Sequence, residues 1–258
     1  MTEPIPQSAR PMVRRGHDGR PDLEPGRRLF IAVPVPETIS RIVEELVGRM
    51  RAEEGEAAPG GATNAGGTTN AAGTTNAAGG GRMPNRVRWV SLDDLHLTVR
   101  FLGPTLDDRL ETLRGAVSAA AAQVAPFTIT IGGAGAFPTI ERPRAIWLGV
   151  ADPAGGMSRL AGAVGSALAA AGWPILDRPF NPHLTLARSD GVRSGPRVAR
   201  RLVAAAHGLE ASFEVERLVL YESHTGGGPA RYEPLHVVAL GGWQPVMRAR
   251  IAAGHGDR

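Results

Sequence analysis

The chain has 258 residues, of which 42% are hydrophobic, enough for one large domain or two closely packed lobes around a buried core. All 29 residues counted as lysine or arginine are arginines, and the formal net charge is +4. The absence of lysine excludes a P-loop lysine, a Schiff base and a lysyl-adenylate, and the absence of cysteine excludes disulfides, thiolate nucleophiles and cysteine-based metal sites.

The first residues of the chain are rich in proline, arginine, glycine and aspartate and show no apolar period, which predicts a disordered tail over residues 1–26. No apolar run approaches the roughly 20 residues that span a membrane, and the N-terminus has no signal-peptide core. We therefore expect a soluble, cytoplasmic protein that does not bind a membrane.

A strand followed by a helix opens the predicted fold. Residues 28–34 (RLFIAVP) form an apolar run typical of a buried strand. Apolar residues recur at helical spacing within residues 37–50 and share one predicted face: Ile39, Ile42, Val43, Leu46 and Val47. Residues 54–81 then repeat glycine, alanine, threonine and asparagine with nothing to bury, and predict a flexible insert.

The remaining elements alternate strands, singly or in pairs, with helices. Strands are predicted over residues 87–90, 96–102, 127–131, 144–150, 183–188, 213–222 and 235–240, and helices over 106–124, 157–171 and 197–207. This order lacks the strict alternation of a doubly wound parallel sheet, so it predicts an α+β fold with mainly antiparallel sheets. Two similar halves predict two pseudo-symmetric lobes with a cleft between them. We expect residues 27–245 to form this single bilobal domain and residues 246–258 to form a C-terminal tail.

The same short motif opens two of these strands: His96-Leu97-Thr98-Val99 and His183-Leu184-Thr185-Leu186. One His-x-Thr occurs easily by chance, whereas two copies, each opening an alternating strand, indicate a shared role. Residues i and i+2 face the same side of a strand, so each histidine projects with its threonine while the leucines point into the core. The motifs therefore predict one imidazole and one hydroxyl from each lobe in a common cleft.

This set of side chains suits the cleavage of a phosphodiester. The reaction needs a base to activate water and an acid to protonate the leaving alkoxide, and two histidines that titrate near neutrality can fill both roles. Threonine hydroxyls can donate hydrogen bonds to the non-bridging oxygens, where charge accumulates. Which histidine is the base stays open, and the assignment favoured here is His183 as base and His96 as acid.

Arginine near the motifs would add a stronger phosphate clamp, and Arg188 is the best candidate because it ends the second motif strand. Simple alternation points Arg188 away from Thr185, so this role requires a bulge that reorients it. Arg100 has the correct parity in the first motif strand and is the second candidate.

Several alternatives remain open from the residues alone. Both histidines could be satisfied side chains on half-buried strands, although the duplication argues against this. Two histidines fall short of the three protein ligands that a catalytic zinc usually needs, so we expect neither a metal nor another cofactor. Phe180 could stack on a nucleobase, but packing in the core is favoured.

The sequence also resembles the 2H phosphoesterases, and within them the bacterial RNA 2′,3′-cyclic phosphodiesterases formerly called 2′-5′ RNA ligases. The resemblance covers most of residues 28–240 and is carried by RLFIAVPVPE, RWVSLDDLHLTVRFLG, GAFP, RPRAIWLGV, RPFNPHLTLAR and LVLYESHTGGGPARYEPLHVVAL. It implies a bilobal α+β fold and metal-independent hydrolysis of RNA 2′,3′-cyclic phosphate ends to 2′-phosphomonoesters. The implied catalytic residues are His96 and His183, and the implied phosphate-binding residues are Thr98, Thr185 and Arg188.

The resemblance leaves other substrates and one non-enzymatic role open. The expected partners are RNA with 2′,3′-cyclic phosphate ends or small cyclic nucleotides, bound by a monomer. The alternatives are another cyclic phosphate, such as ADP-ribose cyclic phosphate, and a non-catalytic module that binds RNA ends. Because the chain lacks lysine, any ligation would have to be the reversal of ester cleavage, which water disfavours.

Overall fold

The computed structural model describes residues 26–53, 87–177, 179–189, 194–224 and 230–242. The predicted N-terminal tail, apart from Gly26, lies outside the described residues, as do the predicted insert at 54–81 and the predicted tail at 246–258. Among the described residues, no helix is long and apolar enough to cross a membrane.

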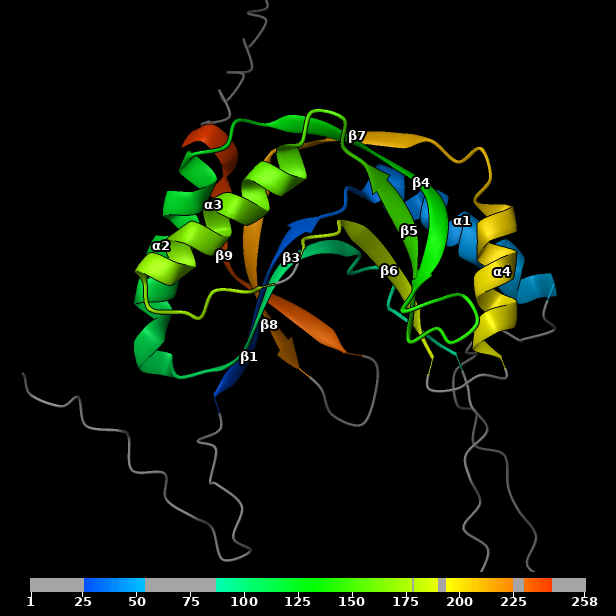
Figure 1. Ribbon diagram of the computed structural model, residues 1–258, viewed down its shortest axis with the longest axis horizontal. Helices are drawn as coiled ribbons and strands as arrows, with labels where there is room; N and C mark the ends of the chain where they lie inside the picture. The colour runs from blue at the N-terminus through cyan, green and yellow to red at the C-terminus, as the bar shows by residue number, and fades with distance from the viewer. Residues whose placement is uncertain (1–25, 54–86, 178, 190–193, 225–229, 243–258) are drawn as a thin grey trace, which may run out of the picture.

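Two antiparallel sheets form the framework of the described residues (Figure 1). The first sheet has the order β3 (His96–Thr105), β1 (Arg27–Pro34), β8 (Arg217–His224) and β9 (Arg231–Ala239). The second has the order β2 (Arg88–Trp89), β6 (His183–Arg188), β5 (Ala145–Ala151), β4 (Phe127–Phe137) and β7 (Ala211–Val215). The predicted α+β class with antiparallel sheets in two lobes is thus confirmed, with one motif strand in each sheet.

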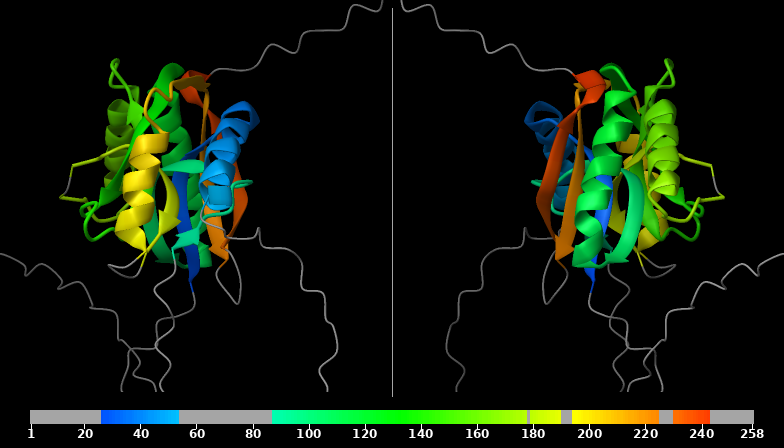
Figure 2. Two further views of the ribbon diagram at one scale, coloured as in Figure 1. Left: turned by 90° about the vertical axis from the view of Figure 1, so that its right-hand side faces the viewer. Right: turned by 90° about the vertical axis from the view of Figure 1, so that its left-hand side faces the viewer.

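The four α-helices of the described residues lie outside the two sheets in pairs, and Figure 2 shows one pair from each side. Helices α2 (Leu110–Ala122) and α3 (Gly156–Ala170) pack together beside the first sheet, and α1 (Glu37–Glu53) and α4 (Gly195–Ala205) pack beside the second. Short 3₁₀ helices cover Asp107–Arg109 and Leu240–Gly242. Helix α1 follows β1 of the first sheet but packs beside the second sheet, and α3 follows β5 of the second sheet but packs beside the first. The chain therefore crosses between the lobes at both helices.

Amphipathic patterning explains how the helices seat on the sheets. In α1 the apolar face buries Ile39, Val43, Leu46, Val47 and Met50 against the core. The prediction that Ile42 belongs to this face is wrong, since Ile42 is 39% exposed. Ile42 lies at the edge of the apolar stripe, where the surface of the helix faces solvent.

The predicted strand over residues 213–222 is in fact two strands that belong to different sheets. Phe213 and Val215 are buried in β7, whereas Leu218 and Leu220 are buried in β8, so the parity of the apolar residues changes between them. The backbone carbonyl of Glu216, between the strands, accepts a hydrogen bond from the amide of Leu240. A change of parity requires an extra residue, and here that residue lets the chain pass from one lobe to the other.

Candidate active site

The two motif strands have the same pattern of burial over six residues. From His96 to Phe101 and from His183 to Arg188 the order is partly buried, buried, partly buried, buried, buried, exposed. Each histidine and threonine thus share the more open face, and the leucine between them is fully buried. This arrangement confirms the alternation predicted from the sequence.

A β-bulge three residues after each histidine changes the parity of the strand. Between β1 and β3, Ala32 pairs with Thr98 and Ile31 pairs with Arg100, so Val99 is the extra residue. Between β5 and β6, Trp147 pairs with Thr185 and Ile146 pairs with Ala187, so Leu186 is the extra residue. The fifth residue after each histidine therefore returns to the face of the histidine.

The bulge in β6 places Arg188 on the same face as Thr185. Arg188 pairs with Ala145 across the sheet, and both line the cleft with His183. The bulge that the role of Arg188 required is present. In β3 the equivalent bulge has the opposite consequence for Arg100, which is 8% exposed and donates to the carbonyl of Pro174. Arg100 therefore does not face the cleft, and Phe101 does.

A cleft of about 770 Å³ lies between the two sheets. The five residues that the sequence singled out all line it: His96, Thr98, His183, Thr185 and Arg188. The first sheet also contributes Arg28, Phe30, Phe101 and Tyr232, and β2 contributes Arg88 and Trp89. Asp94 is the one acidic residue among the described residues that line the cleft, so arginine dominates its charge.

Backbone carbonyls orient both imidazoles in the same way. His96 Nδ1 lies 2.8 Å from the carbonyl oxygen of Asp94, and His183 Nδ1 lies 2.7 Å from that of Asn181. A carbonyl only accepts hydrogen bonds, so each Nδ1 must carry the proton. In the neutral ring Nε2 is then left with its lone pair, which is the atom that can exchange a proton with a substrate.

His96 sits against aromatic rings that remove it partly from water. Its ring centroid lies 4.8 Å from that of Phe30, and the Tyr232 ring meets it edge-on at 4.9 Å. Burial lowers the pKa of His96, and the positive charge of Arg188 lowers it further, against the opposing effect of Asp94. The neutral imidazole is therefore favoured in the free protein.

Tyr232 and Asp94 share this environment. Burial raises the pKa of the Tyr232 hydroxyl, so the group stays a hydrogen-bond donor at neutral pH, and the Arg188 charge acts on it in the opposite direction. Burial also raises the pKa of Asp94, with a further contribution from Asp93. Arg188 thus acts electrostatically on side chains of the opposite lobe, which brings the two halves of the cleft into one site.

A different pair of aromatic rings packs against His183. The Phe137 ring meets it edge-on at 4.9 Å, and Trp147 packs against Phe137 at 5.0 Å. Gly135 makes room for Trp147, because a Cβ at position 135 would lie 2.4 Å from the indole ring. A small residue in β4 thereby supports the histidine of the second motif.

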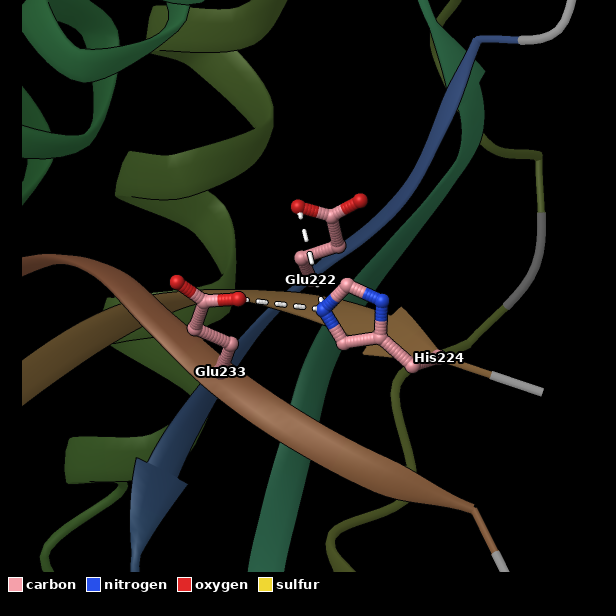
Figure 3. Close-up of side chains that lie close together, drawn as sticks. All are labelled: Glu222, His224 and Glu233. Carbon is pink, nitrogen blue, oxygen red and sulfur yellow. Dashed lines mark hydrogen bonds and ion pairs between the residues drawn. The ribbon is translucent and has the colours of Figure 1, made fainter.

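One cluster of side chains outside the cleft has the atoms to hold a cation. Figure 3 shows Glu222, His224 and Glu233 together, with His224 Nε2 3.1 Å from Glu233 and 4.0 Å from Glu222. Glu222 already pairs with Arg27 at 2.8 Å. On β8, Glu222 and His224 have the opposite parity to Ser223, which lines the cleft, and Glu233 of β9 pairs with Glu222, so the cluster lies on the other face of the sheet.

Some residues of the cleft were not predicted from the sequence. Phe101, Tyr232 and Phe30 line it, and only their place in the sheet reveals this. The single-strand pattern had favoured Arg100 over Phe101 because no residue type announces the bulge. Phe180 packs against the core while partly buried, as favoured from the sequence.

The fold and the site define a two-lobed α+β protein with paired His-x-Thr motifs and an arginine facing one cleft. The chain belongs to the 2′-5′ RNA ligase superfamily, whose sequence pattern matches residues 83–227.

Relatives with established names support this membership. An RNA 2′,3′-cyclic phosphodiesterase of Escherichia coli is 32% identical over 157 residues, which cover 61% of this chain and 82% of that protein. One from Aeropyrum pernix is 31% identical over 160 residues, covering 59% of this chain and 85% of that protein. One from Geobacillus stearothermophilus is 33% identical over 154 residues, which cover 59% of this chain but only 47% of that protein.

Solved structures share the fold. Escherichia coli LigT, in a crystal structure with 3′-AMP, superposes with a TM-score of 0.52 and 27% identity, covering 83% of this chain and 98% of LigT. The Thermus thermophilus protein TT0787 superposes with a TM-score of 0.57 at 22% identity, covering 84% of this chain and all of that one. The fold is therefore shared with solved structures of widely different sequence.

Proposed function

We propose that this protein is an RNA 2′,3′-cyclic phosphodiesterase that hydrolyses the cyclic phosphate at an RNA 3′ end to a 2′-phosphomonoester. The observation that carries the proposal is the convergence of two imidazoles, each with an adjacent threonine and a fixed Nδ1 proton, on one arginine-rich cleft. The relatives named RNA 2′,3′-cyclic phosphodiesterase give the same answer independently.

The chemistry is an in-line displacement at phosphorus. A water oxygen forms a bond to phosphorus while the bond from phosphorus to the 3′ oxygen breaks, which leaves the phosphate on the 2′ oxygen. One Nε2 accepts the proton that the water loses, and the other Nε2 supplies the proton that the 3′ oxygen gains. Thr98 and Thr185 donate hydrogen bonds to the non-bridging oxygens, and Arg188 neutralises the charge that builds up there.

His183 is assigned as the base and His96 as the acid. The burial that lowers the pKa of His96 makes its imidazolium a stronger proton donor. The negative charge of a bound phosphodiester raises the pKa of this ring, so His96 takes up a proton from solvent when the substrate binds and can then donate it. The lobe that holds His96 would then receive the leaving 3′ oxygen, and the lobe that holds His183 would hold the attacking water.

The proposal extends to the state of the protein in the cell. We propose that residues 27–245 act as one catalytic domain of a cytoplasmic monomer. The activity would need no metal, because the two imidazoles supply the proton transfers and the arginine supplies the charge.

A substrate panel in EDTA tests the proposed function. Purified protein is incubated with 2′,3′-cyclic nucleotides, an oligoribonucleotide with a 2′,3′-cyclic phosphate end, and ADP-ribose cyclic phosphate. We expect turnover of the RNA end to a 2′-phosphate, and its loss in both His96→Ala and His183→Ala. Preferred hydrolysis of ADP-ribose cyclic phosphate would move the protein to that substrate class. Tight binding of RNA ends by a wild type that hydrolyses none of them would make it a binding module.

A further inference from the structure

The cleft continues along β1 beyond the two motifs. Ala32, Phe30 and Arg28 alternate along this strand on the face that carries the Phe30 contact to His96. Ala32 pairs with Thr98, and Arg28 lies four residues further, about 13 Å along the strand at the usual rise. Both Phe30 and Arg28 line the cleft, so the open volume extends from the reacting centre to this arginine.

Phe101 lies between these two points and is open to solvent. It is 56% exposed, pairs with Phe30 across the strands, and its ring centroid lies 5.9 Å from that of Phe30. Its position five residues after His96 is equivalent to that of Arg188 after His183, since both follow the same bulge. An exposed aromatic ring in a cleft that arginines line is a suitable platform for stacking a nucleobase.

Arg28 differs from its neighbour Arg27 in what it contacts. Arg27 points to the other face, where it pairs with Asp107 and Glu222, both at 2.8 Å. For the exposed side chain of Arg28, the structure shows no carboxylate partner among the residues that it describes. A guanidinium in this state can bind phosphate without first giving up another partner.

From this arrangement we propose that the cleft has a second phosphate subsite at Arg28, separated from the reacting phosphate by one nucleoside that stacks on Phe101. The ligand of Arg28 is the 5′-phosphate of the terminal nucleotide, which in an RNA chain is its link to the preceding residue. This inference rests on the proposed function and refines it, because it makes the end of a polynucleotide, rather than a free nucleoside cyclic phosphate, the preferred substrate.

Two substrates that differ by one phosphate test the subsite. Adenosine 2′,3′-cyclic phosphate is compared with the same compound carrying a 5′-phosphate, in wild type, Arg28→Gln and Arg27→Gln. We expect the wild type to favour the 5′-phosphorylated substrate in kcat/KM by about tenfold, the order of one charged hydrogen-bonded contact. The ratio should fall toward one in Arg28→Gln and persist in Arg27→Gln, the matched loss of charge on the opposite face.

A salt series and a substitution of the ring add independent readouts. For a cyclic-phosphate-ended oligoribonucleotide, the slope of log kcat/KM against log salt should become shallower by about 0.7 in Arg28→Gln, the contribution of one single-strand phosphate contact. Phe101→Ala should lower kcat/KM by about 5- to 100-fold through lost stacking, and Phe101→Tyr should restore most of it.

The outcomes separate this inference from the proposed function. Hydrolysis of both compounds without a 5′-phosphate preference, or a preference that survives in Arg28→Gln, would overturn the subsite and leave the cyclic phosphodiesterase intact. Absence of turnover on any cyclic phosphate would overturn the proposed function itself. A loss of the ratio in both arginine variants would assign the preference to overall charge and so would also reject the subsite.

Discussion

Replacing Arg188 by glutamine should weaken catalysis and change its pH dependence together. The side chain is exposed on the cleft side of β6, directly after the bulge. If it donates to a non-bridging oxygen, the loss of a charged hydrogen bond costs about 1.5–3 kcal/mol. At 1.36 kcal/mol for each factor of ten, kcat/KM should fall by about 10- to 150-fold.

The pH profile gives the second half of this prediction. Arg188 lowers the pKa of His96, so its removal should raise that pKa. The acid limb of kcat/KM marks the second protonation of the histidine pair, and a higher pKa of His96 makes that protonation occur at higher pH. The acid limb should therefore move to higher pH in Arg188→Gln.

Steady-state rates on a cyclic-phosphate-ended oligoribonucleotide, measured in EDTA across the titration range of histidine, give both quantities. Arg188→Lys is the matched control: it keeps the charge and hence the position of the acid limb, but it loses the two-pronged geometry and should retain intermediate activity. Wild-type kcat/KM in Arg188→Gln, or an acid limb that moves to lower pH, would refute this account of the cleft.

Three further predictions follow from the site. His96→Ala and His183→Ala should each lower kcat by about 100- to 10,000-fold. A substrate with sulfur as the 3′ leaving atom needs little protonation, so it should restore turnover in the His96 variant but not in the His183 variant. The reverse pattern would exchange the two roles. Tyr232→Ala should let water reach His96, raise its pKa and move the acid limb to higher pH, whereas Tyr232→Phe, which keeps the ring, should leave the limb in place; equal shifts in both would rule out burial as the cause. Gly135→Ala should lower the free energy of unfolding by about 1–3 kcal/mol because the new methyl group meets Trp147, and denaturant unfolding that matches the wild type would show that the indole moves without cost.

The sequence predicted which of these side chains share the cleft better than it predicted the path of the strands that carry them. The period of a strand was enough to place each histidine beside its threonine, because that relation spans only two residues. The same rule does not predict which face a residue takes when it follows a bulge. Val99 and Leu186 are ordinary strand residues, and nothing in their chemistry shows that they are the extra ones.

The local sequence pattern also does not predict the interleaving of the lobes, by which helices that follow a strand of one sheet pack beside the other sheet. Strands and helices were predicted near their observed positions, but the helices after β1 and β5 pack beside the opposite sheets. A helix shows in its sequence which face is apolar, not which sheet will cover that face. Only the change of parity between Val215 and Leu218 carries a local signal of a crossing, whereas the sequence over residues 213–222 predicts one continuous strand.

This interleaving has a consequence for how the two histidines are held. The apolar residues of both sheets and all four helices form one continuous core cluster, and the chain passes between the lobes at α1, at α3 and between β7 and β8. Because this core is shared, a hinge motion of one lobe against the other would have to break contacts within it. We therefore expect the separation of His96 and His183 to change little when the substrate binds. In the proposed reaction, donors and acceptors already in place need no reorganisation when charge builds up on the phosphate.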